Sequence, residues 1–333
     1  DLGLEIARGM PHNVTSEMDL ALWDAACAVR DDPISADRFH KGDAQQLAAE
    51  YLAGCLPKAA QTAIETFMER YGMRGLAEFD FGRPRWRENP HNIMQNILSY
   101  LKIEESKAPD VAFANGAKRA EAAAECIAEA VRGTRAGKLK ARLVLFMVSR
   151  FRSWGGLWEY PKFTIIRMMG IARQGLLESG REFVAAGLLK EPDDLFFLYL
   201  KDLEAFARGE EGDWSAQIAQ NRAFFEQEMG RKQIPRLLLS DGRAFFEGVQ
   251  APEGVDGENI LVGSPVSPGV IEGIVRVVLD PHKTQLVPGE ILVCPGTDPA
   301  WTPLFLAAGG LVMEMGGLMT HGAVVAREYG LPA

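Results

Sequence analysis

The sequence has few cysteines, no long apolar run and no excess of positive charge. The four cysteines are far apart and form no Cys-x-x-Cys pair: Cys27, Cys55, Cys126 and Cys294. This spacing argues against a zinc site and against a disulfide framework, and free cysteines suit a reducing cytoplasm. No apolar run reaches membrane-spanning length and no signal peptide is recognisable. From the cysteines we expect a cytoplasmic protein, and from the net charge of −9 we expect neither a nucleic-acid nor a membrane partner.

The sequence also has no apparent glycine-rich nucleotide loop, no metal-ligand cluster, no internal repeat and no low-complexity tract. A length of 333 residues predicts two domains with a substantial core. The chain starts at Asp1 without a methionine and stops at Ala333, inside what should be a βαβ-type unit. These ends indicate a piece of a longer protein.

Residues up to about 250 favour helices. In the segment 44–71, four residues at a spacing near four suit one buried helical face: Leu47, Tyr51, Cys55 and Ala59. Further helices are predicted for the Ala- and Glu-rich stretch 112–133, for 163–179 and after Pro192. Gly180 either ends the helix 163–179 or lies at a bend that joins it to 182–186.

The stretch 139–154 is both basic and apolar, which leaves two interpretations. A basic amphipathic helix can contact a membrane or an anion. We favour the alternative, in which one face is buried and the arginines are paired at the surface.

After about residue 250 the composition shifts to Pro, Gly and Val. Strands are predicted at 273–279, 290–294 and 311–315, with a helix at 303–308 between the last two. The sequence therefore predicts a multidomain protein: a mostly α-helical domain (1–250), a linker (251–258) and a small α/β domain (259–333). Both domains are expected to be incomplete, the first at its N-terminal end and the second at its C-terminal end.

A histidine stands where a short helix should begin, in the segment that runs from Gly316 to Pro332. Two glycines precede it, and Gly330 and Pro332 are typical of a helix end. The first N–H groups of a helix favour an anion, and a neutral imidazole is nucleophilic. His321 is therefore either a phosphoryl carrier or a histidine that merely caps or packs.

This segment resembles the phosphohistidine signature of the swivelling domain in dikinases, a group that includes phosphoenolpyruvate synthase, pyruvate phosphate dikinase and rifampin phosphotransferase. The match is long and ungapped: Gly-Gly-x-x-Thr-His-Gly-Ala-Val-Val-Ala-Arg-Glu-Tyr-Gly-x-Pro-Ala. The glycine after the histidine and the Tyr-Gly at the helix end are similar to the rifampin phosphotransferase branch. The resemblance implies that His321 is the phosphohistidine and that Thr320, Gly322 and Arg327 position the phosphate.

A second candidate segment, 154–163, combines aromatic residues, a carboxylate and an ammonium group. Glu159 and Lys162 are three residues apart and can face the same side if a helix starts there. They form either a surface ion pair beside a helix cap or an acid/base group with a phosphate-binding cation.

The string Glu-Tyr-Pro-Lys-Phe is similar to the active-site segment of the drug-binding domain of rifampin phosphotransferases, which implies catalytic roles for Glu159 and Lys162. In that family an arginine precedes the glutamate and helps bring the phosphohistidine and the acceptor hydroxyl together. This chain has Trp158 at that position, and tryptophan cannot make a bidentate charged contact to phosphate. Three residues are candidates for a substitute: Arg150, Arg152 and Arg167.

Two further expectations concern the same helical region. Trp158, Tyr160 and Met168 are expected to contact an apolar substrate. The charge-dense stretch 70–86 also resembles the family's helical domain; it predicts buried or half-buried ion pairs that fix a loop, or else direct contact with a ligand.

The resemblance implies an enzyme that moves the β-phosphoryl of ATP through phospho-His321 to a hydroxyl of rifampin or a similar apolar molecule, giving AMP and phosphate. ATP and Mg²⁺ would be bound by an ATP-grasp domain of the same parent protein that is missing here, so this segment alone is expected to be inactive. No metal is expected within it. Two alternatives stay open: a phosphoenolpyruvate-synthase-like dikinase with another acceptor, and a diverged drug-binding module without turnover.

Overall fold

The computed structural model describes most of the chain. The described residues are 2–103, 108–210, 212–231, 235, 237–245, 263–279, 281, 284, 286–297, 301–317 and 320–333. Within them, no helix combines the length and the apolar character needed to cross a membrane.

Contacts between Cα atoms divide the chain into two compact units. The first unit contains residues 1–170 and 265–333, and the second contains 171–264. The C-terminal segment therefore packs with the N-terminal helices in one unit. The predicted linker 251–258 lies outside the described residues, so the predicted domain boundaries stay a prediction.

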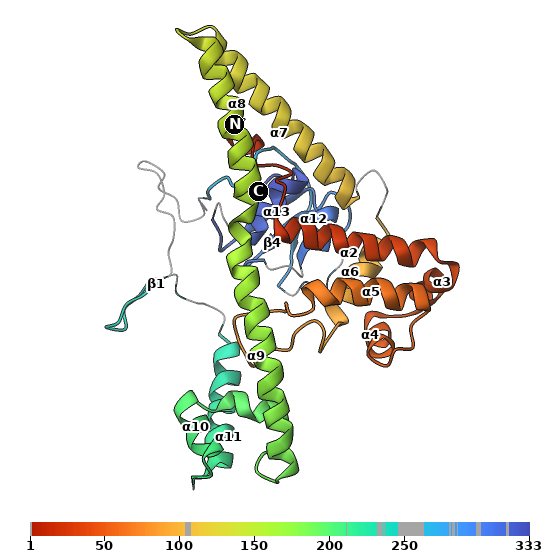
Figure 1. Cartoon of the computed structure of the whole chain (residues 1–333), viewed down its shortest axis with the longest axis vertical. Helices are drawn as coiled ribbons and strands as arrows, with labels where there is room; N and C mark the ends of the chain where they lie inside the picture. Colours follow the sequence, from red (N-terminus) through yellow and green to blue (C-terminus); the bar gives the residue numbers. More distant parts are fainter. Residues whose placement is uncertain are drawn as a thin grey trace. The chain divides into compact units, whose positions relative to one another are not determined.

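The first unit begins with six helices, and short polar side chains cap the N-termini of three of them. These helices are α1 (Leu2–Glu5), α2 (Val14–Asp31), α3 (Pro33–Lys41), α4 (Ala44–Leu52), α5 (Lys58–Tyr71) and α6 (His91–Tyr100) (Figure 1). The side chains of Asn13, Asp32 and Asp43 accept hydrogen bonds from first-turn N–H groups of α2, α3 and α4. Apolar residues of α2, α4, α5 and α6 form one core.

The prediction of one helical face over 44–71 is wrong at its centre. The chain turns between α4 and α5, where Gly54 has a φ of 67° and Pro57 precedes the first residue of α5. Leu47 is buried as expected, but Cys55 is exposed in the turn. The apolar residues keep a helical spacing in the sequence, but Gly54 and Pro57 break the helix between α4 and α5.

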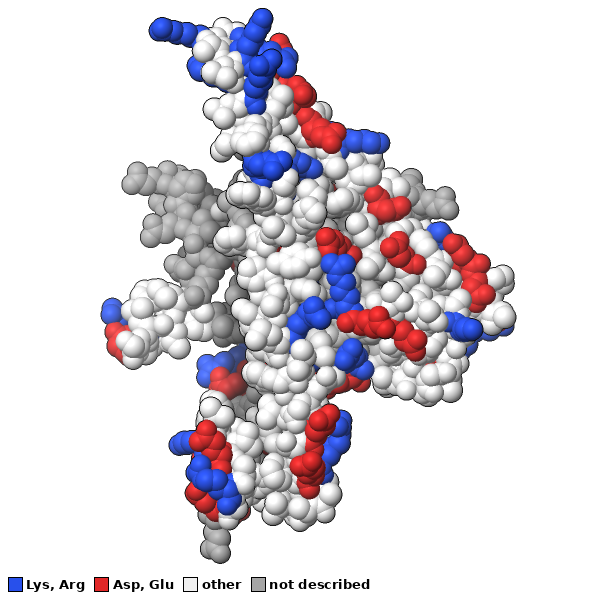
Figure 2. Space-filling model, in the orientation of Figure 1, with Lys and Arg blue, Asp and Glu red and all other residues white. Residues whose placement is uncertain are grey.

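Two long helices form an antiparallel pair, α7 (Pro109–Arg132) and α8 (Gly137–Gly155), which confirms both predicted helices (Figure 1). The expected burial of one face of α8 is found in part: α8 packs against α7, and Val144, Leu145 and Val148 are half-buried at the spacing of one helical face. Ala141 is its buried side chain, whereas large apolar residues are exposed: Leu139, Leu143, Phe146, Met147, Phe151 and Trp154. Much of the surface along α8 is uncharged in Figure 2, although basic side chains interrupt it at the start of the helix and farther along.

A short 3-10 helix, η2 (Gly156–Glu159), joins α8 to α9 (Tyr160–Ala185). Gly156 is buried at this junction, and a Cβ atom there would lie 2.1 Å from the carbonyl oxygen of Pro11 and 2.9 Å from the amide nitrogen of Asn13. Because these are backbone atoms, they cannot move aside without shifting the chain. This contact fixes the turn that presents Glu159.

The second unit is a small helical cluster. It contains α9 beyond Gly170, η3 (Pro192–Phe197), α10 (Leu200–Ala207), α11 (Trp214–Met229) and a hairpin of β1 (Leu237–Leu238) and β2 (Ala244–Phe245). The helix α9 runs through Gly180 without ending. Of the two alternatives for this position, the one that joins 163–179 to the following helical segment is therefore correct. Predicting only helices before residue 250 missed the two-residue strands of the hairpin.

The C-terminal part of the first unit is a small α/β layer. Three parallel strands lie in the order β3 (Val275–Val277), β4 (Ile291–Cys294) and β5 (Gly310–Met313), with α12 (Thr302–Ala307) between the last two. The helix α13 (His321–Tyr329) follows β5. The predicted fold class, mostly helical and then α/β, is confirmed.

We predict that Gly156→Ala lowers the free energy of unfolding by about 1–3 kcal/mol, because the added methyl group overlaps backbone atoms of the segment 11–13. Chemical denaturation measures this change. Gly133→Ala is the matched control, since nothing lies within 4 Å of a Cβ atom at that position. Equal stability of the two variants would contradict the close approach at Gly156.

Candidate active site around His321

His321 is the first residue of α13, as the sequence predicts. Thr320 occupies the N-cap position with an extended backbone, but its side chain makes no cap hydrogen bond to the helix. Its hydroxyl instead donates to the carbonyl oxygen of Gly317 at 2.8 Å. Gly330 ends the helix in the left-handed conformation, with a φ of 71°. The first-turn N–H groups of α13 therefore receive no cap from the side chain of Thr320.

Gly322 is buried beside the preceding strand. A Cβ atom at this position would lie 2.3 Å from Thr297 Oγ1 and 2.5 Å from Met313 Sδ. The absence of a side chain lets α13 approach β5 closely behind His321. This packing is a structural reason for glycine here, beside the phosphate-positioning role that the resemblance implies.

The imidazole of His321 lies within the electrostatic influence of charged residues from the helical part of the first unit. The residue is half-buried, and its Nε2 atom is buried with no hydrogen-bond partner among the described residues. Burial lowers the pKa of His321 to about 3; the positive charges of Arg74 and Lys162 act in the same direction, and Glu78 opposes them. The structure thus brings His321 and Lys162 into one neighbourhood, with the imidazole neutral at pH 7.

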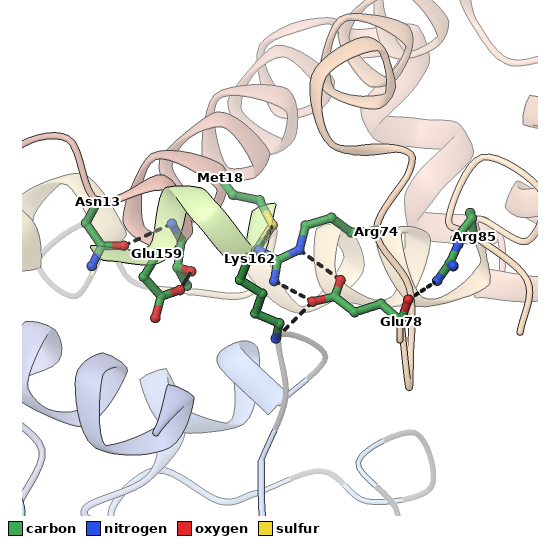
Figure 3. Close-up of polar contacts among 8 residues, drawn as sticks. Asn13, Met18, Arg74, Glu78, Arg85, Glu159 and Lys162 are labelled. Carbon is green, nitrogen blue, oxygen red and sulfur yellow. Dashed lines mark hydrogen bonds and ion pairs between the residues drawn. The ribbon is translucent and has the colours of Figure 1, made fainter. Parts of the chain in front are cut away.

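Lys162 and Glu159 each have a partner from another element. Lys162 Nζ lies 3.0 Å from Glu78 Oε1 and 5.5 Å from the centre of the Phe79 ring. Glu159 accepts a hydrogen bond of 2.5 Å from Thr15 Oγ1 at the start of α2. The two residues come from adjacent turns, as Figure 3 shows, and they do not pair with each other.

Arg74 and Glu78 join this site from the loop after α5. Arg74 Nε and Nη2 lie 3.1 Å and 3.0 Å from the two carboxylate oxygens of Glu78, and both side chains are buried (Figure 3). The expectation of buried ion pairs in the stretch 70–86 is confirmed. The sequence showed the charges, but not that they lie near His321, because that proximity depends on the tertiary fold.

The residues expected to contact an apolar substrate differ in exposure. Trp158 is 68% exposed and Met168 is 64% exposed. Tyr160 is half-buried; its hydroxyl accepts a 3.4 Å hydrogen bond from Arg70, and its ring packs edge-on against Phe163. Trp158 and Met168 therefore present free apolar surface, whereas Tyr160 belongs partly to the core.

The three candidate substitutes for the family's arginine have other contacts. Arg150 lies over the ring of Phe146, and Arg167 lies over the ring of Phe163. Arg152 donates to the carbonyl oxygens of three residues: Ile6, Arg8 and Gly9. None of the three is among the charges that act on His321, whereas Arg74 is.

The C-terminal end of α13 is anchored to the chain segment before α2. Glu328 accepts a hydrogen bond of 2.6 Å from the amide of Gly9 and a longer one of 3.5 Å from Met10. Arg8 Nη1 donates in the other direction, to the carbonyl oxygen of Arg327 at 2.8 Å. These bonds fix the helix that begins at His321 against the helical layer.

Arg327 contributes to the same anchoring within the C-terminal segment. It lies in the last turn of α13, where it is buried and donates to the carbonyl oxygen of Val266 at 3.0 Å. This bond ties α13 to the start of the α/β part. A role for Arg327 in positioning phosphate stays a prediction.

Glu328 is an uncommon buried carboxylate. Burial raises its pKa to about 7, against the N–H groups of Gly9 and Met10 and the charges of Arg152 and Arg327. Because the folded pKa exceeds the unfolded value, this group favours the anchored state most at low pH, and that contribution falls as the pH rises through about 7.

We predict that Glu328→Ala destabilises the protein by about 1–3 kcal/mol, because it leaves the buried amide of Gly9 without an acceptor. Glu328→Gln keeps an acceptor oxygen and should cost less. Denaturation measures stability, and amide hydrogen exchange in α13 measures local opening. If both variants behave alike at pH 7, the hydrogen bonds do not anchor the helix.

We also predict that Lys162→Gln raises the pKa of His321, because it removes one of the charges that disfavour the imidazolium. In the wild type, the unfolded chain binds a proton on His321 below about pH 6.5 and the folded chain does not, so stability should fall as the pH falls toward 3. NMR titration of the ring measures the pKa, with the exposed Lys138→Gln as control. A wild-type pKa near 6.5 would refute the buried arrangement.

The described residues contain no group of three or more His, Cys, Asp or Glu side chains that could hold a metal ion. The four cysteines are free.

Comparisons with known proteins match both parts of the first unit. Residues 3–159 match the model of the rifampicin phosphotransferase fourth domain, and residues 286–333 match the PEP-utilising enzyme mobile domain. A rifampicin phosphotransferase of Streptomyces sviceus is 38% identical over 97% of this chain, and one of Bacillus subtilis is 34% identical over 98%. A prodigiosin synthesizing transferase of Serratia marcescens is 28% identical over 96% of the chain and is matched over 36% of its own length.

The two rifampicin phosphotransferases are each matched over 37% of their length. The chain thus spans about a third of these relatives and includes their fourth-domain and mobile-domain segments. With two family models on it and these relatives aligned along nearly all of it, the chain belongs to the rifampicin phosphotransferase family of PEP-utilising enzymes.

Proposed function

We propose that this chain is the acceptor-binding and phosphohistidine-carrying part of an ATP-dependent phosphotransferase. The main support is the position of His321: it begins α13, its Nε2 atom is buried without a partner, and the charges of Lys162 and Arg74 act on it. A neutral imidazole beside positive charge suits a group that receives and releases a phosphoryl dianion. The relatives' names support the same reaction type.

The donor in this proposal is ATP with Mg²⁺, bound by an ATP-grasp domain outside this chain, and the other products are AMP and phosphate. The described residues provide no metal cluster, so no step is assigned to ATP or Mg²⁺ here. His321 contributes a nucleophile: because its pKa is lowered to about 3, Nε2 keeps its lone pair at neutral pH when Nδ1 carries the proton.

In the second step the phosphoryl group moves from Nε2 to a hydroxyl of the acceptor. The P–N bond breaks and a P–O bond forms, while Nδ1 keeps its proton, so that neutral imidazole is the leaving group. Glu159 takes the hydroxyl proton as general base, and Lys162 offsets charge on the transferred group. Thr15 holds the Glu159 carboxylate through its hydrogen bond.

The acceptor in this proposal is rifampin or another apolar molecule with a hydroxyl group. Trp158, Met168 and, more weakly, Tyr160 would supply contact area beside Glu159. Thr320, Gly322 and Arg327 keep the proposed role of placing the phosphohistidine. The cytoplasm is the compartment that we propose for this reaction.

The test uses a protein that contains this chain and the ATP-grasp domain, with Mg-ATP and rifampin, followed by mass spectrometry of the drug. We expect rifampin to gain one phosphoryl group, and His321→Ala to abolish the gain. Phosphorylated His321 with unchanged drug would contradict the acceptor, and transfer to pyruvate would then indicate a phosphoenolpyruvate-synthase-like enzyme. Tight binding of rifampin without its phosphorylation would indicate a drug-binding module. Trp158, in place of the family's arginine, is the feature that keeps this alternative open.

We predict that Glu159→Gln slows transfer from phospho-His321 by about 100-fold or more, as loss of a general base does. Phosphorylation of His321 by ATP should be unaffected in this variant. Single-turnover loss of the label from the protein measures the transfer rate. The control is the exposed Glu69→Gln on α5. Full transfer by a normally folded Glu159→Gln variant would rule out the base role.

A further inference from the structure

A buried carboxylate lies between two cations in the first unit. Glu78 has a 5% exposed side chain and is contacted by Arg74, which is 3% exposed, and by Lys162, which is 45% exposed. The contacts are 3.0–3.1 Å from the guanidinium and 3.0 Å from Lys162 Nζ. The cluster therefore carries a net charge of about +1, with Lys162 as its exposed member.

The loop that bears Arg74 and Glu78 is fixed by several bonds. The backbone amide of Trp86 donates to the carbonyl oxygen of Arg74 at 2.8 Å, and the backbone amide of Arg87 donates to the carbonyl oxygen of Gly72 at 3.0 Å. Arg85 Nη1 donates to the carbonyl oxygen of Glu78 at 2.7 Å. The positions of the two charged side chains are thus set before any ligand binds.

Spare hydrogen-bond donors remain in this cluster. An ammonium group has three N–H donors, and Glu78 is the anionic partner of Lys162. Arg74 Nη1 has a weak acceptor, Met18 Sδ, at 3.6 Å. Lys162 therefore has both the donors and the exposure to bind an anion, whereas the buried Arg74 contributes its charge.

His321 Nε2 is a buried atom that has no hydrogen-bond partner among the described residues. The same three charges, those of Arg74, Lys162 and Glu78, act on its imidazole. In Figure 3 the ribbon of the C-terminal segment lies on the side toward which Lys162 points.

We propose that Arg74, Glu78 and Lys162 form the binding site for the phosphoryl group on His321 Nε2 while α13 is anchored. Lys162 Nζ contacts the phosphoryl oxygens, Arg74 supplies the guanidinium charge that position 158 lacks, and Glu78 positions both cations. This inference rests on the proposed carrier role of His321. It assigns Arg74, rather than Arg150, Arg152 or Arg167, as the substitute.

The test is an NMR titration of the 333-residue chain with inorganic phosphate, which needs neither ATP nor an acceptor. The five histidines are resolved by their ring signals, and His321 is assigned with a His321→Gln variant. We expect a saturable shift of the His321 ring that chloride at equal ionic strength does not produce. Absence of that shift in the wild type would overturn the proposal.

Lys162→Gln should weaken phosphate binding by about 10-fold or more, the usual effect of losing a hydrogen bond from a charged donor. The exposed Lys138→Gln should bind as the wild type does. Wild-type affinity in Lys162→Gln would overturn the role of Lys162.

Arg74→Gln alone would leave the buried negative charge of Glu78 with Lys162 as its remaining cationic partner. Because a buried charge that loses a partner is strongly destabilising, this variant can fail to fold. The double variant Arg74→Gln/Glu78→Gln removes one charge of each sign, so the net charge of the cluster stays about +1. If phosphate binding depends on the positions of the charged side chains and not on their net charge, this variant binds phosphate about 10-fold more weakly. Wild-type affinity in the double variant would overturn the assignment of Arg74.

Failure of this inference and failure of the proposed function are distinguishable. Phosphate binding at the cluster with no transfer to rifampin would support the site and contradict the acceptor. Transfer to rifampin with no phosphate-dependent shift of His321 would support the function and overturn the site.

Discussion

The position of His321 depends on a buried carboxylate at the other end of its helix. Glu328 accepts hydrogen bonds from backbone amides of the segment before α2, and Arg8 donates back to the last turn of α13. A nine-residue helix is a short rigid body, so anchoring one end fixes the direction of the other. This contact therefore helps to hold His321 where burial and the charges of Arg74 and Lys162 lower its pKa.

The two ends of α13 carry ionisable groups whose pKa values are shifted in opposite directions. At its first residue burial, aided by the charges of Arg74 and Lys162, keeps an imidazole neutral, whereas at Glu328 burial keeps a carboxylate near its titration point at pH 7. A phosphoryl group on His321 would add negative charge at the positive end only. Loading of the carrier would therefore strengthen the attraction to Lys162 without disturbing the bonds of Glu328.

Local features of the sequence predicted much of this arrangement. The helix start at His321, the end at Gly330 and three strands in the C-terminal part follow from turn residues and apolar runs. The periodicity argument failed at Gly54, where a break interrupts the apolar spacing. The burial expected for one face of α8 holds in part, because six of its large apolar residues are exposed. The grouping of Arg74 with His321 could not be predicted, because residues far apart in sequence meet there through the tertiary fold. The sequence indicated Glu159 and Lys162, but not their partners Thr15 and Glu78.

Arg152 contacts the N-terminal segment through carbonyl oxygens alone. Its guanidinium donates to the backbone of three residues and to no side chain there: Ile6, Arg8 and Gly9. Such a contact is indifferent to side-chain identity, so homologues could vary residue 6 freely without losing it. Position 9 is different, since its φ of 52° and the backbone of α7 within 2.4 Å of a Cβ atom exclude any side chain. Homologues should therefore tolerate many different residues at position 6 and retain glycine at position 9.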